Sequence, residues 1–200
     1  MDISHLIEII GACIGLGYLY LEYKASLWLW SVGILMSLFY IVIFYHSKFY
    51  ADMGIYIYYL GANIFGLAVW KREAQAHSEK AACSGIAHIP RKYILPAAGA
   101  VLLFWVALWQ LLDRFTDSPV ALGDAFTTAL SIVAMWLMAR KYLEHWWLWV
   151  VVNSVSVGLY FWKGLYPTGV LFVIYSVVSV FGYFRWLRCK SEAWSGSGKQ

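Results

Sequence analysis

The sequence predicts an all-α membrane protein with seven transmembrane helices, arranged as three, one and three. Hydrophobic residues make up 62% of the chain and charged residues 13%, whereas soluble domains have about 45–50% and about 25%. The apolar residues fall into blocks that approach the roughly 20 residues a helix needs to cross a bilayer. Many blocks end in Trp or Tyr, which are enriched where a membrane meets water.

Short polar segments separate the seven predicted spans, which cover residues 3–20, 27–45, 53–70, 94–112, 120–138, 146–162 and 168–187. The first block lacks a basic start and a small-residue cleavage site, so it is expected to remain as a membrane helix. The chain then divides into a first three-helix repeat (1–70), a cytoplasmic loop (71–93), a linking helix (94–112), a second three-helix repeat (120–188) and a cytoplasmic tail (189–200). The loop is polar and rich in small residues, which predicts poor order.

The distribution of Lys and Arg predicts the orientation in the membrane. Of 15 such residues, only Lys48, Arg114 and Lys163 lie on one side of the predicted spans. Basic residues concentrate in cytoplasmic segments, so the N-terminus is expected outside and the C-terminus in the cytoplasm. These residues occupy connecting loops instead of forming a stripe, so the expected partner is the lipid bilayer and not nucleic acid.

An internal repeat joins the two ends of the chain. Residues 49–70 and 165–186 match at a shift of 116, pairing Tyr59 with Tyr175, Gly66 with Gly182 and Trp70 with Trp186. In the preceding spans, Leu29-Trp30 is paired with Leu148-Trp149 and Ser37 with Ser156. Three spans plus one linking span give both copies the same direction, an arrangement that resembles SWEET-type sugar carriers. Parallel repeats of this kind place a substrate site near the midplane, at their junction.

The sixth predicted span carries polar groups on one face. Trp146, Trp149, Asn153, Ser156 and Tyr160 follow one another at steps of three and four residues, which form one side of a helix. Polar groups in hydrocarbon are costly unless they are paired, so this face is expected to border protein or a cavity. Asn153 has two interpretations that stay open: a hydrogen bond to a neighbouring helix or a contact to a substrate.

Other spans add candidates with similar chemistry. Tyr59 and Tyr175 lie near the middle of their spans, and Thr128 shares a helix face with Asp124, whose charge also suits a helix start. The complete set of substrate-binding candidates is Trp149, Asn153, Tyr160, Gln110, Thr128, Tyr59, Tyr175, Trp30 and Trp146.

The chemistry missing from the spans favours a passive carrier. Apart from span ends, only Glu8 is an intramembrane charge, whereas proton-coupled carriers use chains of such groups. No nucleotide-binding loop, catalytic triad or metal-binding pair is apparent, and the three scattered cysteines predict neither a metal site nor a disulfide framework. We therefore expect no enzyme activity, no cofactor and no metal. Aromatic walls suit flat cations, at about 2 kcal/mol or more per desolvated cation–π contact.

Residues 124–166, together with LEYKASLWLW (21–30) and residues 49–70, resemble the PnuC family of bacterial vitamin transporters. The resemblance implies a 3+1+3 fold and uptake of nicotinamide riboside by facilitated diffusion, followed by trapping through cytoplasmic phosphorylation. For a small cationic aromatic vitamin of this kind, Trp149 would stack on the ring, Asn153 would hydrogen-bond and Tyr160 would line the cavity. The resemblance also implies a homotrimer, which no residue pattern in the chain indicates.

Met135 departs from the pattern, because nicotinamide riboside carriers often have Gln at this place. With LEYKASLWLW it resembles the thiamine-carrying branch called PnuT, so thiamine is an alternative substrate. A SWEET-type sugar carrier is a second alternative, although it has less need of Trp. A receptor or structural subunit, in which the polar faces serve packing alone, is a third.

Overall fold

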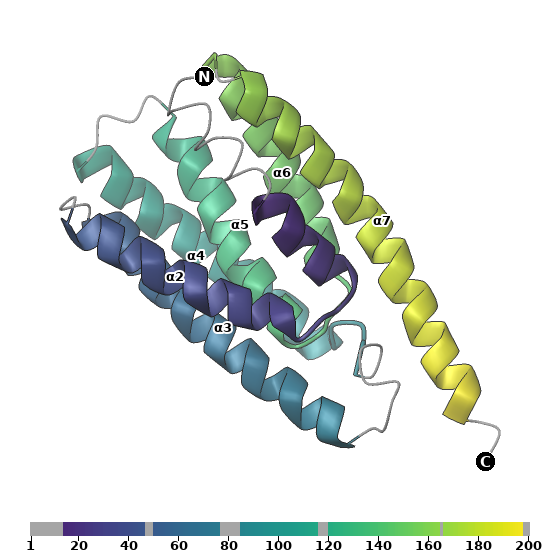
Figure 1. Cartoon of the computed structure of the whole chain (residues 1–200). Coiled ribbons are helices and arrows are strands. Elements are labelled where there is room, and N and C mark those ends of the chain that lie inside the picture. Colours follow the sequence, from purple (N-terminus) through teal and green to yellow (C-terminus); the bar gives the residue numbers. More distant parts are fainter. Residues whose placement is uncertain (1–13, 47–49, 77–84, 116–119, 165, 198–200) are drawn as a thin grey trace, which may run out of the picture. The chain divides into compact units, whose positions relative to one another are not determined.

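The computed structural model describes residues 14–46, 50–76, 85–115, 120–164 and 166–197, and it is the structure of an all-α membrane protein. The described residues form seven helical segments (Figure 1). These are residues 14–23, α2 (Trp28–His46), α3 (Tyr50–Ala76), α4 (Arg91–Phe115), α5 (Ala121–Ala139), α6 (His145–Trp162) and α7 (Tyr166–Ser197). The predicted first span begins outside the described residues, and α3 and α7 continue beyond the predicted ends at 70 and 187.

Five of these helices contain a stretch long and apolar enough to cross a membrane: α2, α4 and α5, Met53–Gln75 of α3 and Tyr166–Ser191 of α7. Helix α6 is not among them, because its 18 residues include His145, Asn153 and several tryptophans. Asn153 and the tryptophans, which lower the hydropathy of α6, also include three of its binding candidates, Trp146, Trp149 and Asn153.

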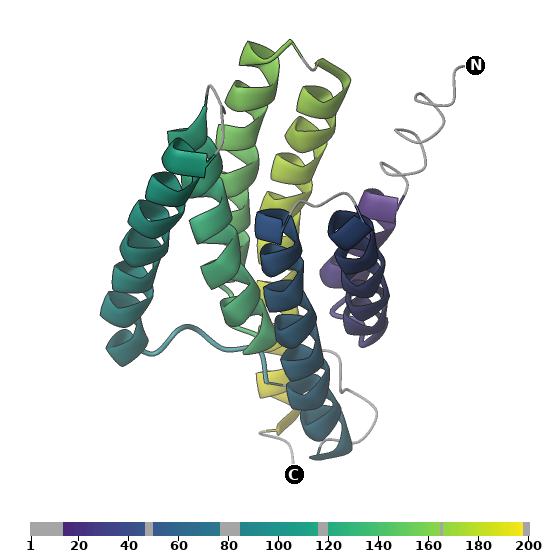
Figure 2. The same cartoon turned by 90° about the vertical axis from the view of Figure 1, so that its left-hand side faces the viewer.

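The chain forms two compact units, described separately here. The first unit, residues 1–85 with 189–200, contains the segment 14–23, α2 and α3; the second, residues 86–188, contains α4, α5, α6 and most of α7. In the second unit α5 contacts both α4 and α6 (Figure 2). Helix α5 holds ten buried residues, while α4 holds none. Leu95 and Leu103 of α4 are 81% and 68% exposed, as expected for side chains that face lipid.

A tryptophan packed over a glycine joins α2 to α3. Trp30 is fully buried, and its ring meets Trp70 edge-on at a centroid distance of 5.3 Å. The ring lies so close to Gly66 that a Cβ built there would be 2.5 Å from it. Only glycine leaves room for this approach, as small residues generally do between membrane helices.

The same arrangement joins α6 to α7. Trp146 is fully buried, meets Trp186 edge-on at 5.8 Å and covers Gly182, where a Cβ would lie 2.5 Å from the ring. Trp30 therefore corresponds to Trp146, and the predicted correspondence with Trp149 is wrong. The tryptophan-rich sequence permits both alignments, and the contact with glycine selects the shift of 116.

The connections before α2 and α6 follow the same shift. Ala25 and Lys141 are the non-glycine residues with positive φ among the described residues, at 51° and 54°, and they lie 116 residues apart. A left-handed conformation is uncommon for a residue with a Cβ, so its recurrence marks an equivalent turn in each unit.

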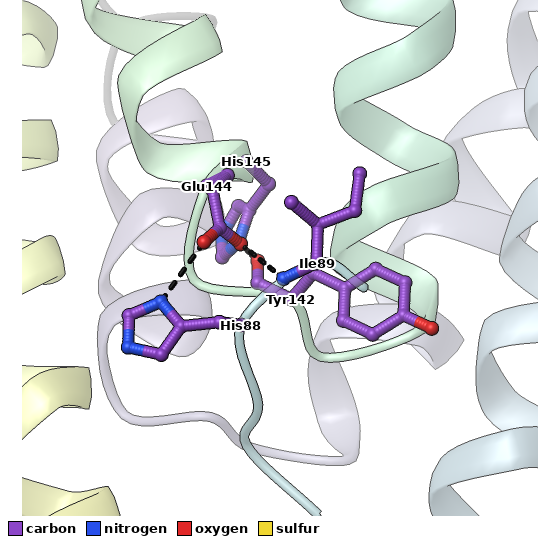
Figure 3. Close-up of polar contacts among 5 residues, drawn as sticks. All are labelled: His88, Ile89, Tyr142, Glu144 and His145. Atoms are coloured by element: carbon purple, nitrogen blue, oxygen red, sulfur yellow. Dashed lines mark hydrogen bonds and ion pairs between the residues drawn. The ribbon is translucent and has the colours of Figure 1, made fainter. Parts of the chain in front are cut away.

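The end of the predicted loop is held in place, so the expectation of poor order is wrong for residues 86–90. Ala87 forms a parallel bridge with Tyr142: its N–H donates to Lys141 O, and its carbonyl accepts from Leu143 N. Glu144 accepts a hydrogen bond of 2.8 Å from Ile89 N and pairs with His88 Nδ1 at 2.9 Å (Figure 3). Backbone pairing of this kind has no hydrophobic periodicity by which a sequence could reveal it.

The cysteine prediction also needs correction. Cys189 is disulfide-bonded, whereas the scattered cysteines predicted no disulfide framework. Spacing along the chain does not reveal which thiols a fold brings together.

Gly66→Ala should lower the free energy of unfolding by about 1–3 kcal/mol, because the new methyl group overpacks against the Trp30 ring. Gly61→Ala in the same helix is the matched control, since nothing lies within 4 Å of its Cβ position. The control should be neutral or slightly stabilising, because alanine is the better helix former by about 1 kcal/mol. Thermal unfolding in detergent measures both. Equal melting temperatures for the two variants would contradict the Trp–Gly contact.

Glu144→Ala should loosen His88 and Ile89 from the α5–α6 connection, because it removes both the ion pair and the acceptor of the Ile89 N–H, while the backbone bonds of Ala87 remain. A hydrogen bond to a charged group contributes about 1.5–3 kcal/mol. His88→Ala removes only an exposed ion pair, worth about 0–1 kcal/mol, and serves as the control. Amide hydrogen exchange at Ile89 should quicken in Glu144→Ala far more than in His88→Ala; the opposite order would refute the arrangement.

Candidate functional site

The polar face of α6 is joined to α7 by buried side chains. Asn153 Nδ2 donates to Ser179 Oγ at 3.3 Å, and Ser179 Oγ donates in turn to Tyr175 O at 2.8 Å. Asn153 is 7% exposed and Ser179 is fully buried. On the adjacent side, the hydroxyls of Ser154 and Ser176 lie 3.1 Å apart. The interhelical interpretation of Asn153 therefore has a concrete partner.

The first unit contains the same bond with its residues exchanged. Asn63 Nδ2 of α3 donates to Ser37 Oγ of α2 at 3.4 Å, and the two residues are again 26 positions apart. At the shift of 116, Ser37 corresponds to Asn153 and Asn63 to Ser179. The predicted pairing of Ser37 with Ser156 is thus wrong, for the same reason as the Trp149 pairing.

A glycine explains why the amide can come from α3. A Cβ at Gly33 would lie 2.1 Å from Asn63 Oδ1, so the amide occupies space that only glycine leaves. The position equivalent to Gly33 in the second unit is Trp149, which has a large side chain, and there α7 supplies the smaller Ser179. The helix that supplies the asparagine therefore depends on the residue at position 33 or 149. The asparagine comes from α3 where this residue is Gly33, and from α6 where it is Trp149.

Three rings form a cluster between α6 and α7. Tyr160 and Phe172 lie 4.9 Å apart between centroids, and Phe172 and Tyr175 lie 5.5 Å apart. Sequence reasoning included both tyrosines and missed Phe172. The signal was present, because Phe172 precedes Tyr175 by three residues and continues the same stripe on α7.

Trp149 lies one turn before Asn153 on the same face. Its side chain is half-buried, and its indole Nε1 is buried without a hydrogen-bond partner in the part of the chain that the structure describes. An unsatisfied buried donor costs about 1–3 kcal/mol. A ligand that accepted from this N–H would remove that cost. The indole Nε1 atoms of Trp30 and Trp146 are likewise buried without a partner among the described residues, so this observation does not distinguish Trp149 from the packing tryptophans, and its role toward a substrate stays a prediction.

The remaining predicted residues lie in varied surroundings. Trp30 and Trp146 form the tryptophan–glycine contacts, so helix packing accounts for their burial and their role toward a substrate stays a prediction. Tyr59 belongs to the first unit and contacts Tyr56 at 5.7 Å. Thr128 is half-buried on α5 and Gln110 is exposed on α4; the contacts of the α6–α7 cluster do not include them.

A charged pair lies at one end of α6. Lys163 Nζ, just after the helix, is 3.4 Å from Asp124 Oδ2 in the first turn of α5. Both side chains are partly exposed, at 29% and 37%. Asp124 therefore has an ionic partner in addition to its favourable place at a helix start.

The sequence profile of a family described as nicotinamide mononucleotide transporter matches residues 5–188. The chain belongs to this family. It is 27% identical over 207 residues to the nicotinamide riboside transporter PnuC of Escherichia coli (strain K12), covering 93% of this chain and 87% of that protein. It is 28% identical over 194 residues to the riboflavin/roseoflavin transporter RibM of Streptomyces davaonensis, covering 95% and 90%.

A crystal structure of the vitamin B3 transporter PnuC has the same fold. It superimposes with a TM-score of 0.67 at 24% identity, covering 90% of this chain and 80% of the other. The resemblance to the PnuC family that the sequence motifs indicated is thereby confirmed, as is the all-α membrane fold.

The hydrogen bond between Ser37 of α2 and Asn63 of α3 should still form when the two residues are exchanged. Asn63→Ser alone shortens the reach to Ser37, and Ser37→Asn alone crowds two amides together, so each should cost about 1 kcal/mol or more. The double variant reproduces the order seen for Asn153 and Ser179 and should regain most of the lost stability. Thermal unfolding of the two single variants and the double variant measures the coupling. A double variant that is merely the sum of the single losses would contradict it.

Proposed function

We propose that this protein takes up nicotinamide riboside across the bacterial inner membrane by facilitated diffusion, and that cytoplasmic phosphorylation then traps the product. The family match over residues 5–188 is the observation that carries the proposal. Nicotinamide riboside has a flat, cationic pyridinium ring and a polar ribose. The α6 face offers the indole ring of Trp149, the amide of Asn153 and the phenol of Tyr160, which suit these two parts.

The sequence of the spans supports a passive mechanism. Residues 27–45, 53–70, 94–112 and 146–162 contain no Asp, Glu, Lys or Arg, whereas ion-coupled carriers place such groups along the transport path. Stacking of a desolvated cation on an aromatic ring, worth about 2 kcal/mol or more, can bind the ring without a compensating charge. The substrate's concentration gradient, maintained by phosphorylation inside the cell, would then drive uptake.

A different flat vitamin is the second candidate. Met135 is 5% exposed on α5 and stands where nicotinamide riboside carriers often have Gln, which favours thiamine. The relative named riboflavin/roseoflavin transporter widens the class of flat ring systems to be tested. Each of these compounds presents an aromatic ring to the same kind of site.

The membrane arrangement belongs to the same proposal. Twelve of the 15 Lys and Arg residues lie on the side assigned to the cytoplasm, which favours an N-terminus outside and a C-terminus inside. Two parallel three-helix repeats with a linking helix are supported by the contacts that recur at a shift of 116 in α2–α3 and α6–α7. A homotrimer remains part of the proposal through the family alone.

Purified protein should be stabilised against heat by its substrate, because a ligand that binds only the folded state raises stability by RT ln(1 + [L]/Kd). Nicotinamide riboside is expected to raise the melting temperature most. Thiamine and riboflavin are measured in the same assay as the alternative substrates. Uptake of the same compounds into proteoliposomes, with no ion gradient imposed, tests the passive mechanism. A larger shift with thiamine or riboflavin would reassign the substrate, and no shift with any of the three would refute the proposal.

Trp149→Ala should weaken substrate binding at least tenfold, because loss of about 1.4 kcal/mol or more of ring stacking corresponds to that factor. Trp147→Ala is the matched control, since Trp147 is 46% exposed and packs on Tyr183 at 5.2 Å. Asn153→Ala should both lower the melting temperature and weaken binding if Asn153 contacts the substrate. Normal affinity in a destabilised Asn153→Ala variant would leave only the interhelical role.

A further inference from the structure

The α2–α3 and α6–α7 helix pairs share a frame of three features, although most of their side chains differ. The shared features are the Trp–Gly contact, the Asn–Ser bond and the preceding left-handed turn, all at a shift of 116. On the helix face that carries these contacts, Gly33 of α2 is replaced by Trp149 of α6, and Tyr40 by Ser156. Both replacements are within one turn of Asn153.

Tyr40 fills a defined place in the first unit. Its ring stacks on Tyr56 of α3 at a centroid distance of 4.7 Å and an interplanar angle of 29°. Phe44, one turn later on α2, lies 6.0 Å from Tyr40 and 5.4 Å from Tyr56. Three rings therefore pack together, and the Tyr40 ring covers one of the other two almost face to face.

The second unit keeps two of these three rings. Phe44 corresponds to Tyr160 and Tyr56 to Phe172, and this pair lies 4.9 Å apart at an angle of 37°, close to the 36° of the first pair. The third position is Ser156, which is 7% exposed and so faces protein instead of lipid. The hydrogen bonds from α6 to α7 made by Asn153 and Ser154 do not involve Ser156. The position of the Tyr40 ring in the first unit is therefore held by a serine in the second, where Phe172 has Tyr175 as a further ring neighbour at 5.5 Å.

We propose that the substrate supplies this third ring: a single six-membered aromatic ring stacks on Phe172 where the Tyr40 ring stacks on Tyr56, and Ser156 determines specificity by keeping that place free of a side chain. The proposal rests on the proposed function, which provides the class of flat vitamin. It makes the α6–α7 pair the half that holds the ring. Trp149 and Asn153 precede Ser156 on the same face of α6, within two turns of it. The α2–α3 pair fills the equivalent place with its own tyrosine.

The size of the place follows from the residue that fills it in the first unit. A tyrosine side chain carries one six-membered ring, so a pyridinium or pyrimidine ring matches it, while a fused three-ring system is too wide. The proposal therefore predicts that wild-type protein binds nicotinamide riboside or thiamine more tightly than riboflavin.

The test uses the full-length purified protein in detergent, with nicotinamide riboside and thiamine as probes in thermal-shift and proteoliposome uptake assays. Ser156→Tyr should weaken binding of the active probe at least tenfold while the protein stays folded, because the first unit shows that the frame accommodates this ring. Ser156→Ala keeps the place free and should bind within twofold of wild type. Ser156→Tyr protein that binds and transports like wild type would overturn the proposal.

A second pair of variants covers the case in which Ser156→Tyr fails to fold. Phe172→Leu removes the proposed stacking partner and should weaken binding at least tenfold, whereas Tyr56→Leu removes its counterpart in the first unit and should change affinity less than twofold. The reverse order would place the ring in the other half and overturn the inference. Wild-type protein that responds to neither probe would instead refute the proposed function, so the two failures are distinguishable.

Discussion

Close approach of two helices at a glycine is the constraint on which the rest of the structure depends. In hydrocarbon the hydrophobic effect does not drive helices together, so van der Waals contact and hydrogen bonds must do so. The Trp30 and Trp146 rings provide that contact, and they can do so only because Gly66 and Gly182 leave the opposing surface bare. Once each tryptophan ring packs against its glycine, the register of the two helices in each pair, α2–α3 and α6–α7, is fixed. The Asn–Ser bond and the aromatic cluster then fall at defined distances further along the pair.

The sequence predicted the class of fold, because apolar blocks of membrane length need no tertiary information to be recognised. It also predicted that Trp149, Asn153 and Tyr160 share one face of α6, since helical periodicity places them together. It misaligned α2 with α6, because a run containing several tryptophans can be matched in more than one way and only a contact with glycine decides. It missed the position of residues 86–90, since a short backbone bridge leaves no periodic pattern.

The candidate site was predictable as a set of residue types and less so as an arrangement. A buried amide can serve a neighbouring helix or a ligand, and Asn153 has the helix partner Ser179. Phe172 was overlooked because phenylalanine in a membrane span is ordinarily read as lipid-facing. Its spacing from Tyr175 was visible in the sequence, but its contacts with Tyr160 and Tyr175 are visible only in the structure. The difference between the aromatic clusters of the α2–α3 and α6–α7 pairs thus lies in which rings are in contact. No single position in the sequence reveals it.

The reversed Asn–Ser bond has a consequence for how such chains are compared. What the two helix pairs have in common is an interaction and the room around it, while the identities of the residues that form it differ at every one of the coupled positions 33/149, 37/153 and 63/179. An alignment that scores columns one at a time counts three disagreements there. A score that treats columns jointly would recognise one unchanged feature, and would find ancient duplications of this kind where residue identity has already faded.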